Sequence, residues 1–182
     1  KSIDWGEAQT PREERSLAFW YDLRANIRRD RGDLIGAEED IRKSIDWGEA
    51  QTPREERSLA AWRGSRARIR MERGDLKGAE DDIRKSIGWF SQSPPSTRDL
   101  AIQYETMALI FANGGKLEEA RAAINESVGL YTVAFGADHE WTKAVMETQR
   151  AIHERRERGV SLGFGSWLRR WWVAWRRVWG RT

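Results

Sequence analysis

The sequence contains one stretch of 18 residues twice without a change. Residues 1–18 and 43–60 are identical, and residues 1–42 match residues 43–84 at 33 of 42 positions. A third, diverged copy begins at Lys85, and Ser127-Val128 stands where a fourth would begin. A fixed period of this length is the mark of a stacked repeat array. We therefore predict an array over residues 1–158, with repeats at about 1–42, 43–84 and 85–126 and a partial repeat at 127–158.

Each repeat is predicted to form two helices. Thr10-Pro11-Arg12-Glu13 and its copy Thr52-Pro53-Arg54-Glu55 are typical of a helix start, with a cap, a proline at the first position and a capping-box acid. Apolar residues then recur at helical spacing in the first copy at Leu17, Trp20, Leu23 and Ile27. Gly32 suits the left-handed residue that ends this helix, and Asp33 can cap the next.

The third copy follows the same design with other residues. Ser96 can cap its first helix, Asn113-Gly114-Gly115 forms the turn, and a second helix is predicted from about Lys116 to Phe135. Residues 141–158 are predicted to form one more helix. Because each repeat is predicted to be a pair of helices, the predicted fold class is all-α.

These patterns resemble tetratricopeptide repeats, which are helix–turn–helix units that stack into an α-solenoid. The residues at the family's spacing are Gly32, Ala37, Ile41 and Ser44, then Gly74, Ala79, Ile83 and Ser86, then Tyr104, Met107, Ala108, Phe111, Gly115, Ala120, Ile124 and Ser127. The 42-residue period and the turn from Phe135 to Thr142 are similar to the kinesin-light-chain-like subtype. The resemblance implies a non-catalytic scaffold that binds another protein or a peptide.

Five arginines are the candidate peptide-binding residues of this scaffold. Arg63, Arg66 and Arg70 share one helix face, and Arg24 and Arg28 repeat part of the pattern 42 residues earlier. The resemblance places the first helix of each repeat along the concave groove, where a row of arginines would suit an acidic peptide. The alternative is that these arginines pair with Glu38, Glu39, Asp40, Glu80, Asp81 and Asp82 on neighbouring helices, or are only solvated.

The C-terminal region has a different composition. A glycine-rich linker at 159–165 precedes a tail at 166–182, which is predicted to form an amphipathic helix. One face of that helix would carry Trp167, Leu168, Trp171, Trp172, Trp175, Val178 and Trp179, and the remaining surface Arg169, Arg170, Arg176 and Arg177. No stretch approaches the roughly 20 apolar residues that span a bilayer.

Three interpretations of the tail remain open. The tail could cap the end of the array or mediate self-assembly into a homo-oligomer, because an exposed apolar end of an array must be covered. It could instead bind an anionic membrane surface, with the repeats as a spacer or sensor, because Trp and Arg suit the headgroup plane. Another partner is the third option. Nucleic acid is disfavoured, because the net charge is only +3 and no nucleic-acid motif is present.

The composition makes enzyme chemistry the least favoured class. The chain has no cysteine and only two histidines, His139 and His153, neither of which has a nucleophile or a metal-ligand set at useful spacing. We therefore expect no enzyme activity, cofactor or metal. The lack of cysteine also favours a cytoplasmic protein, peripheral to a membrane if the tail binds lipid. Because Lys1 lies within a repeat, we expect the sequence to be a fragment of a longer protein.

Overall fold

The computed structural model describes residues 11–51, 53, 55–92 and 96–158, apart from the side chains of residues 11, 12 and 156–158. All the regular structure in these ranges is helical. Seven helices follow one another: α1 (Pro11–Asp30), α2 (Leu34–Ala50), α3 (Glu56–Arg73), α4 (Leu76–Gln92), α5 (Thr97–Asn113), α6 (Leu117–Phe135) and α7 (Glu140–Arg158). The all-α prediction is confirmed for the described residues.

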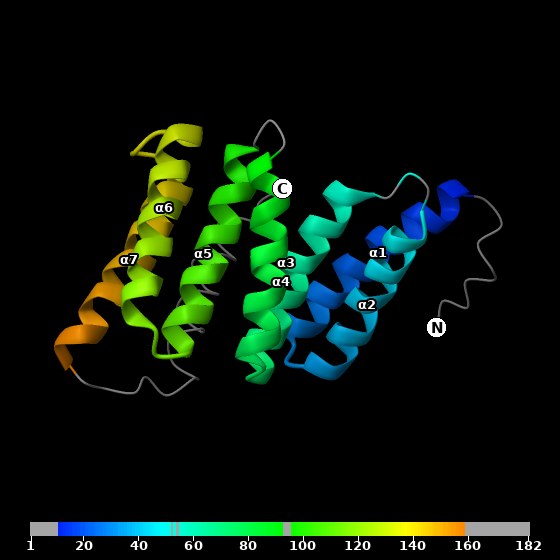
Figure 1. Cartoon of the computed structure of the whole chain (residues 1–182), viewed down its shortest axis with the longest axis horizontal. Helices are drawn as coiled ribbons and strands as arrows, with labels where there is room; N and C mark the ends of the chain where they lie inside the picture. The colour runs from blue at the N-terminus through cyan, green and yellow to red at the C-terminus, as the bar shows by residue number, and fades with distance from the viewer. Residues whose placement is uncertain (1–10, 52, 54, 93–95, 159–182) are drawn as a thin grey trace.

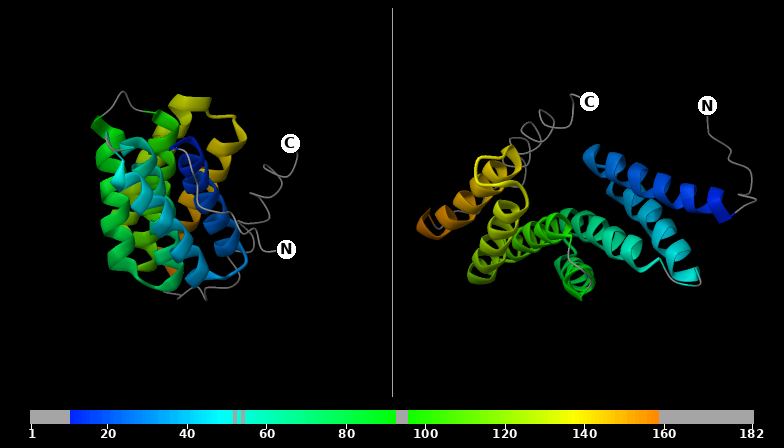
Figure 2. Two further views of the ribbon diagram at one scale, coloured as in Figure 1. Left: turned by 90° about the vertical axis from the view of Figure 1, so that its right-hand side faces the viewer. Right: turned by 90° about the horizontal axis from the view of Figure 1, so that it is seen from above.

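The helices pack in chain order (Figure 1). Each helix contacts the next one along the chain, and α3 also contacts both α1 and α5. Seen from above, the row bends, so that α1 and α7 approach each other on one side (Figure 2). Contacts are therefore mostly between sequence neighbours, as expected for repeats that cannot bury their apolar faces alone.

The turns inside the repeats form as predicted. Gly32 and Gly74 have φ values of +82° and +86°, a left-handed conformation that costs other residues strain. Asp33 and Asp75 then cap the following helices, and the Oδ1 atom of each accepts a hydrogen bond of 2.9 Å from the backbone N–H of Gly36 or Gly78. Local chemistry alone thus determines where α2 and α4 begin.

The start of α3 differs from the prediction. The pattern at 52–55 predicts a start at Pro53, but α3 begins at Glu56, and Glu55 makes no capping hydrogen bond. The Glu55 carboxylate instead accepts hydrogen bonds from Arg15 Nη2 (3.4 Å) and Ser58 Oγ (3.5 Å). The described contacts of Glu55 are thus with α1 and with the first turn of α3.

One buried hydrogen bond joins the two helices of each full repeat. The hydroxyl groups of Ser44, Ser86 and Ser127 donate to the carbonyl oxygens of Ala18, Ala60 and Ala101 at 2.7, 2.7 and 2.8 Å, always across 26 residues. The three serines are fully buried. Around them lie fully buried small and branched side chains: Ala37, Ile41, Ala79, Ile83, Ala120 and Ile124. The third copy therefore packs like the first two despite its different sequence.

In the first copy, most of the apolar side chains that recur at helical spacing along the first helix are not buried. Trp20 is 62% exposed, while Trp62, its counterpart in the second copy, is 1% exposed. Leu23 and Ile27 are 49% and 43% exposed, whereas Ile69, the counterpart of Ile27, is fully buried. The reason is the position in the row, because α2 covers this face of α3 and none of the described helices covers that face of α1.

Two parts of the sequence prediction lie outside the described residues, namely the linker at 159–165 and the tail at 166–182. None of the helices within the described ranges combines the length and hydropathy that a membrane span needs. The partial fourth repeat is represented by the end of α6 and by α7, which packs on α6.

Candidate functional site

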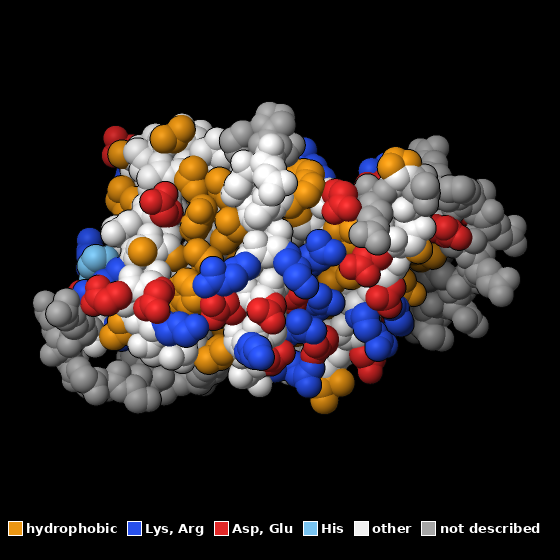
Figure 3. All heavy atoms as spheres, in the orientation of Figure 1, with side chains coloured by type: hydrophobic (Ala, Val, Ile, Leu, Met, Phe, Trp, Pro, Cys, Tyr) orange, Lys and Arg blue, Asp and Glu red, His pale blue; other side chains and the backbone are white. Residues whose placement is uncertain are grey.

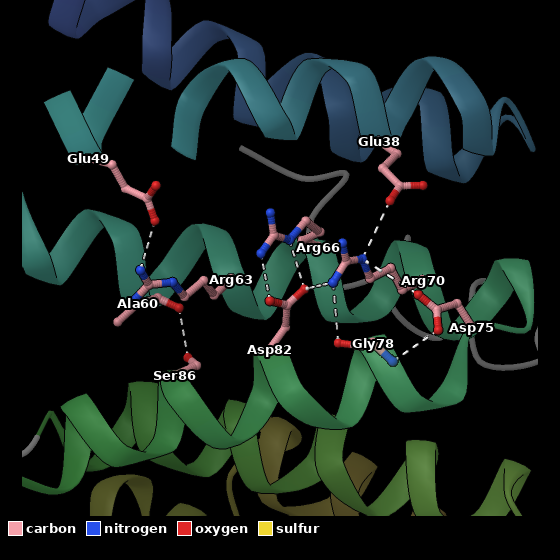
Figure 4. Close-up of polar contacts among 10 residues, drawn as sticks. All are labelled: Glu38, Glu49, Ala60, Arg63, Arg66, Arg70, Asp75, Gly78, Asp82 and Ser86. Atoms are coloured by element: carbon pink, nitrogen blue, oxygen red, sulfur yellow. Dashed lines mark hydrogen bonds and ion pairs between the residues drawn. The ribbon is translucent and has the colours of Figure 1, made fainter. Parts of the chain in front are cut away.

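Arg63, Arg66 and Arg70 lie in a row along α3, between α2 and α4 (Figure 4). Arg66 meets Asp82 through two hydrogen bonds, from its Nε and Nη2 atoms to the two carboxylate oxygens, both 2.7 Å long. Arg70 Nη1 donates to Asp82 Oδ2 at 2.9 Å. Asp82 is 1% exposed, so these charge-assisted bonds balance a carboxylate that water does not reach.

The first copy repeats this arrangement. The Nε and Nη2 atoms of Arg24 donate to Asp40 at 2.7 Å each, and Arg28 Nη1 lies 3.1 Å from Asp40 Oδ2. The hydrogen bond to Asp40 is the main cause that raises the pKa of the Arg24 guanidinium, and Asp82 does the same for Arg66. These arginines join the two helices within each of the first two repeats.

Other contacts of the row link the first repeat to the second. Arg63 Nη2 lies 3.1 Å from Glu49 Oε1, and Arg70 Nε lies 3.4 Å from Glu38 Oε1. Arg73 forms an ion pair with the other oxygen of Glu38. Glu38 and Glu49 are on α2, so the second helix of the first repeat is bound electrostatically to the first helix of the second.

All five predicted peptide-binding arginines thus carry ion pairs to carboxylates of the chain. For four of them the acids are Asp40, Asp82 and Glu38, which the pairing alternative includes. Arg63 pairs with Glu49, which that alternative does not include. The Arg24 side chain is 50% exposed, but those of Arg28, Arg63, Arg66 and Arg70 are only 19–34% exposed. Basic and acidic side chains alternate on the face that Figure 3 presents, rather than forming a patch of one sign. Binding of a partner by these arginines stays a prediction.

The third copy shows that the fold does not need these pairs. Met107, Phe111 and Ala123 stand where the second copy has Arg66, Arg70 and Asp82. Phe111 and Ala123 are buried, and Met107 packs on them as part of the same apolar cluster. Within one chain the same interhelix position is filled once by apolar side chains and twice by ion pairs.

A different surface emerges where the first two copies differ. Of the nine positions that differ between residues 1–42 and 43–84, seven lie in the first helix, at 19, 21, 22, 23, 26, 29 and 30. All but position 21 fall on one side of a helix with 3.6 residues per turn. We call these six positions, with 61, 64, 65, 68, 71 and 72 in the second copy, the varied face. Arg24 and Arg28 lie about 200° around the helix from Asp22 and Asn26, on the opposite side.

The varied face carries a cluster of polar groups, most of them half-buried, that crosses from helix to helix. Asp22 on α1 accepts a hydrogen bond from Ser65 on α3, and Asp22 and Glu105 both attract Arg68 electrostatically. Glu105, on α5, is at the position of Asp22 in the third copy and bonds with Tyr131. Arg29 joins the cluster through an ion pair of 3.6 Å with Glu72.

A glycine makes room for one further member of this cluster. In the second copy Gly64 stands at the position of Asp22 and Glu105. A Cβ atom there would lie 2.2 Å from Gln103 Oε1, so the Gln103 amide occupies space that a larger residue at position 64 would take. Gln103 is 6% exposed, and its Oε1 atom has no hydrogen-bond partner among the described residues.

Burial governs the protonation equilibria of this cluster. Desolvation is the main cause that raises the pKa of Asp22 and Glu72, and it raises that of Glu105 to about 7. Burial, and next the nearby charge of Arg29, lower the pKa of Arg68 to about 10. Desolvation also raises the pKa of Tyr131. Perturbed groups of this kind concentrate at functional sites, although structural networks produce them too.

The cluster offers carboxylates, guanidinium groups and an amide oxygen in half-buried positions, which suit polar and charged side chains of a ligand. No set of three or more His, Asp or Glu side chains that could hold a metal ion occurs in the described part of the chain. His139 accepts a hydrogen bond of 3.2 Å from the Trp141 backbone at Nδ1, and His153 is exposed on α7.

The apolar periodicity and the capping patterns do not reveal the varied face. A residue-by-residue comparison of the two copies does, because six of the nine differing positions fall on one face of the first helix. The role of Arg68 could not be seen in this way, because its neighbours come from α1 and α5. No protein-family model matches the chain, and neither does any curated protein sequence.

Proposed function

We propose that the protein is a non-catalytic interaction scaffold, an α-solenoid of tetratricopeptide-like repeats, that binds a polypeptide along the varied face of its first helices. The observation that carries the proposal is where two nearly identical repeats differ. They keep most of the residues that pack the helices, and six of their nine differences lie on one face of the first helix. In a repeat array, the surface that changes from repeat to repeat while packing stays constant is the surface suited to recognition.

The arrangement of the helices supports this proposal. Because α3 contacts both α1 and α5, the first helices of successive repeats lie next to one another on the inside of the bend (Figure 2). Equivalent positions such as Asp22, Gly64 and Glu105 then follow one another across the array. An extended surface of this kind matches an extended peptide, which can contact several repeats at once.

The charge of the varied face favours a peptide with basic side chains. The cluster holds Asp22, Glu72 and Glu105 against Arg29 and Arg68, and burial raises the pKa of all three acids. A raised carboxylate pKa means that the anion is incompletely compensated, so an approaching cation would stabilise it. The alternative partner is the acidic peptide that the arginine row predicts, with Arg24 as the most exposed contact.

The test separates these two surfaces. Twelve-residue peptides of basic, neutral and acidic composition, matched in their apolar residues, are labelled with fluorescein, and their binding to the intact chain is measured by anisotropy. We expect the basic peptides to bind best. Asp22→Asn combined with Glu105→Gln should weaken them at least about five-fold, since each lost charge contact contributes about 0.5–1 kcal/mol. Arg24→Gln is the matched control and should leave basic-peptide binding unchanged.

Other outcomes would overturn parts of this proposal. Preferential binding of acidic peptides that Arg24→Gln abolishes would assign recognition to the arginine row instead of the varied face. Binding of none of the peptides, by a chain whose circular dichroism shows intact helices, would contradict the scaffold function itself.

A further inference from the structure

The outer side of α1 is an apolar surface that the other described helices leave open. Trp20, Leu23 and Ile27 follow one another along it, and each is between 43% and 62% exposed. Large apolar side chains are common singly on protein surfaces, but three on one helix face form a patch. We call the surface formed by Trp20, Leu23 and Ile27, with Arg28 and Arg31 at its edge, the outer face of α1.

The second repeat shows what covers an equivalent face. Trp62 and Ile69, the counterparts of Trp20 and Ile27, are buried together with Leu59, and α2 packs on them. The counterpart of Leu23 is Ser65, which bonds with Asp22 of α1. Gly48 provides the close approach, because a Cβ atom at that position would lie 2.8 Å from Trp62 Cζ3 and 2.9 Å from Leu59 Cδ2. The Trp47 ring meets the Trp62 ring edge-on, with centroids 6.2 Å apart.

The charged edge of the covered face also has its counterpart on α1. On α3, Arg70 and Arg73 bind Glu38 of α2. The residues at the same repeat positions on α1 are Arg28 and Arg31. Arg28 pairs with Asp33 and Asp40 of its own repeat, as Arg70 pairs with Asp75 and Asp82. What α1 lacks among the described residues is the carboxylate that corresponds to Glu38.

We propose that the outer face of α1 is a docking site for the second helix of another repeat of this type. The occupant is an amphipathic helix with the features of α2: a glycine at the Gly48 position for Trp20, an adjacent tryptophan, and an acid at the Glu38 position for Arg28 and Arg31. The proposal rests on the α2–α3 interface inside the chain, which already joins the same residue types, and not on the function of the varied face.

The internal repeat permits a direct test. Residues 1–8 have the same sequence as residues 43–50, the C-terminal part of α2. Adding the nine residues Leu34–Arg42 in front of Lys1 therefore completes a second copy of the α2 sequence, followed by α1 at its natural spacing. We expect this extended chain to melt about 5 °C or more above the original chain, because Trp20 and Ile27 become buried. Amide hydrogen exchange in α1 should slow at the same time.

Matched variants keep the test specific. Gly6→Leu in the extended chain places a side chain in the space that the Trp20 ring would occupy. This variant should abolish the rise in melting temperature. Charge reversal of the added acid that corresponds to Glu38 should reduce the gain. Trp20→Ala, at an exposed position, should leave the original chain folded and remove most of the gain.

Two results would overturn the proposal. One is an extension that leaves both the melting temperature and hydrogen exchange in α1 unchanged, or that stabilises equally well with Gly6→Leu. The other is a loss of stability on Gly6→Leu in the original chain as large as in the extended chain. That second result would mean that residues 1–8 of the chain itself, rather than another repeat, cover the face.

Discussion

Asp82 accepts three hydrogen bonds from two arginines at a position that is 1% exposed. Replacing it by alanine would leave Arg66 and Arg70 partly buried without their main partner. We expect Asp82→Ala to lower the free energy of unfolding by about 3–5 kcal/mol, the usual effect of breaking a buried ion pair from one side. Urea unfolding monitored by circular dichroism measures this change.

The third copy supplies the control for this prediction. Its Met107 and Ala123 fill the positions of Arg66 and Asp82 with apolar atoms. The double variant Arg66→Met, Asp82→Ala should therefore recover a large part of the lost stability, because no unpaired guanidinium remains at position 66. A double variant as unstable as Asp82→Ala alone would show that the pair is not the cause.

Glu105 gives the varied face a definite pH dependence. Its pKa is raised from 4.5 to about 7 by burial, so between these values the folded chain binds more protons than the unfolded chain. Stability must then fall as the pH rises from about 4.5 to 7. Glu105→Gln removes this pH-dependent loss of stability. The free energy of unfolding of the variant should therefore exceed that of the original chain by on the order of 1–3 kcal/mol at pH 8, and by little at pH 5.

Urea unfolding of both chains at pH 5, 6, 7 and 8 tests whether stability falls as the pH rises. The raised pKa values of Asp22 and Glu72 act in the same direction, so the variant should keep a weaker slope of its own. A difference between the two chains that stays constant across this range would contradict the assignment of the slope to Glu105.

At the same residue scale, the candidate site was only partly predictable. The spacing of Arg63, Arg66 and Arg70 predicts one helix face, and the pairing of Arg66 and Arg70 with Asp82 and Glu38 is one of the alternatives that the sequence leaves open. The pairing of Arg63 with Glu49 is not among them. The sequence could not decide between pairing and exposure, because that depends on the distance between α2, α3 and α4. The desolvation of Glu105 likewise depends on α6, which lies on the far side of a turn.

Two glycines show how the helices themselves constrain the packing. Gly48 and Gly88 both lie inside helices, α2 and α4. An added Cβ at Gly48 would lie 2.8 Å from Trp62, whereas one at Gly88 would meet nothing within 4 Å. We expect Gly88→Ala to stabilise the chain by about 0.5–1 kcal/mol through the higher helix propensity of alanine.

Gly48→Ala should act in the opposite direction. The methyl group would displace the Trp62 ring, and this overpacking should lower the free energy of unfolding by about 1–3 kcal/mol. Urea unfolding of the two single variants in parallel separates propensity from packing, since the substitution is the same. Stabilisation by Gly48→Ala would show that the α2–α3 interface can accommodate an additional methyl group.

At this element scale the sequence predicts most of the fold. Helix ends set by one or two residues, such as Gly32, Asp33 and Ser96, occur where local chemistry places them. The start of α3 and the exposure of Trp20 did not follow from the sequence, although copies of both stretches exist elsewhere in the chain. Identical residues differ in helix start and in burial between the two copies, because both depend on the neighbouring helix and not on the local sequence.

The whole molecule should be most stable in the middle of the row. In a repeat array, each element is stabilised mainly by its neighbours. Helix α3 contacts α1, α2, α4 and α5, whereas α1 has a covered side toward α2 and α3 and an open outer face. Hydrogen exchange followed by mass spectrometry should therefore find the slowest amides in α3 and α5 and the fastest helical amides in α1 and α7, which packs mainly on α6. Equal protection in α1 and α3 would instead mean that the described helices open only together, as one cooperative unit.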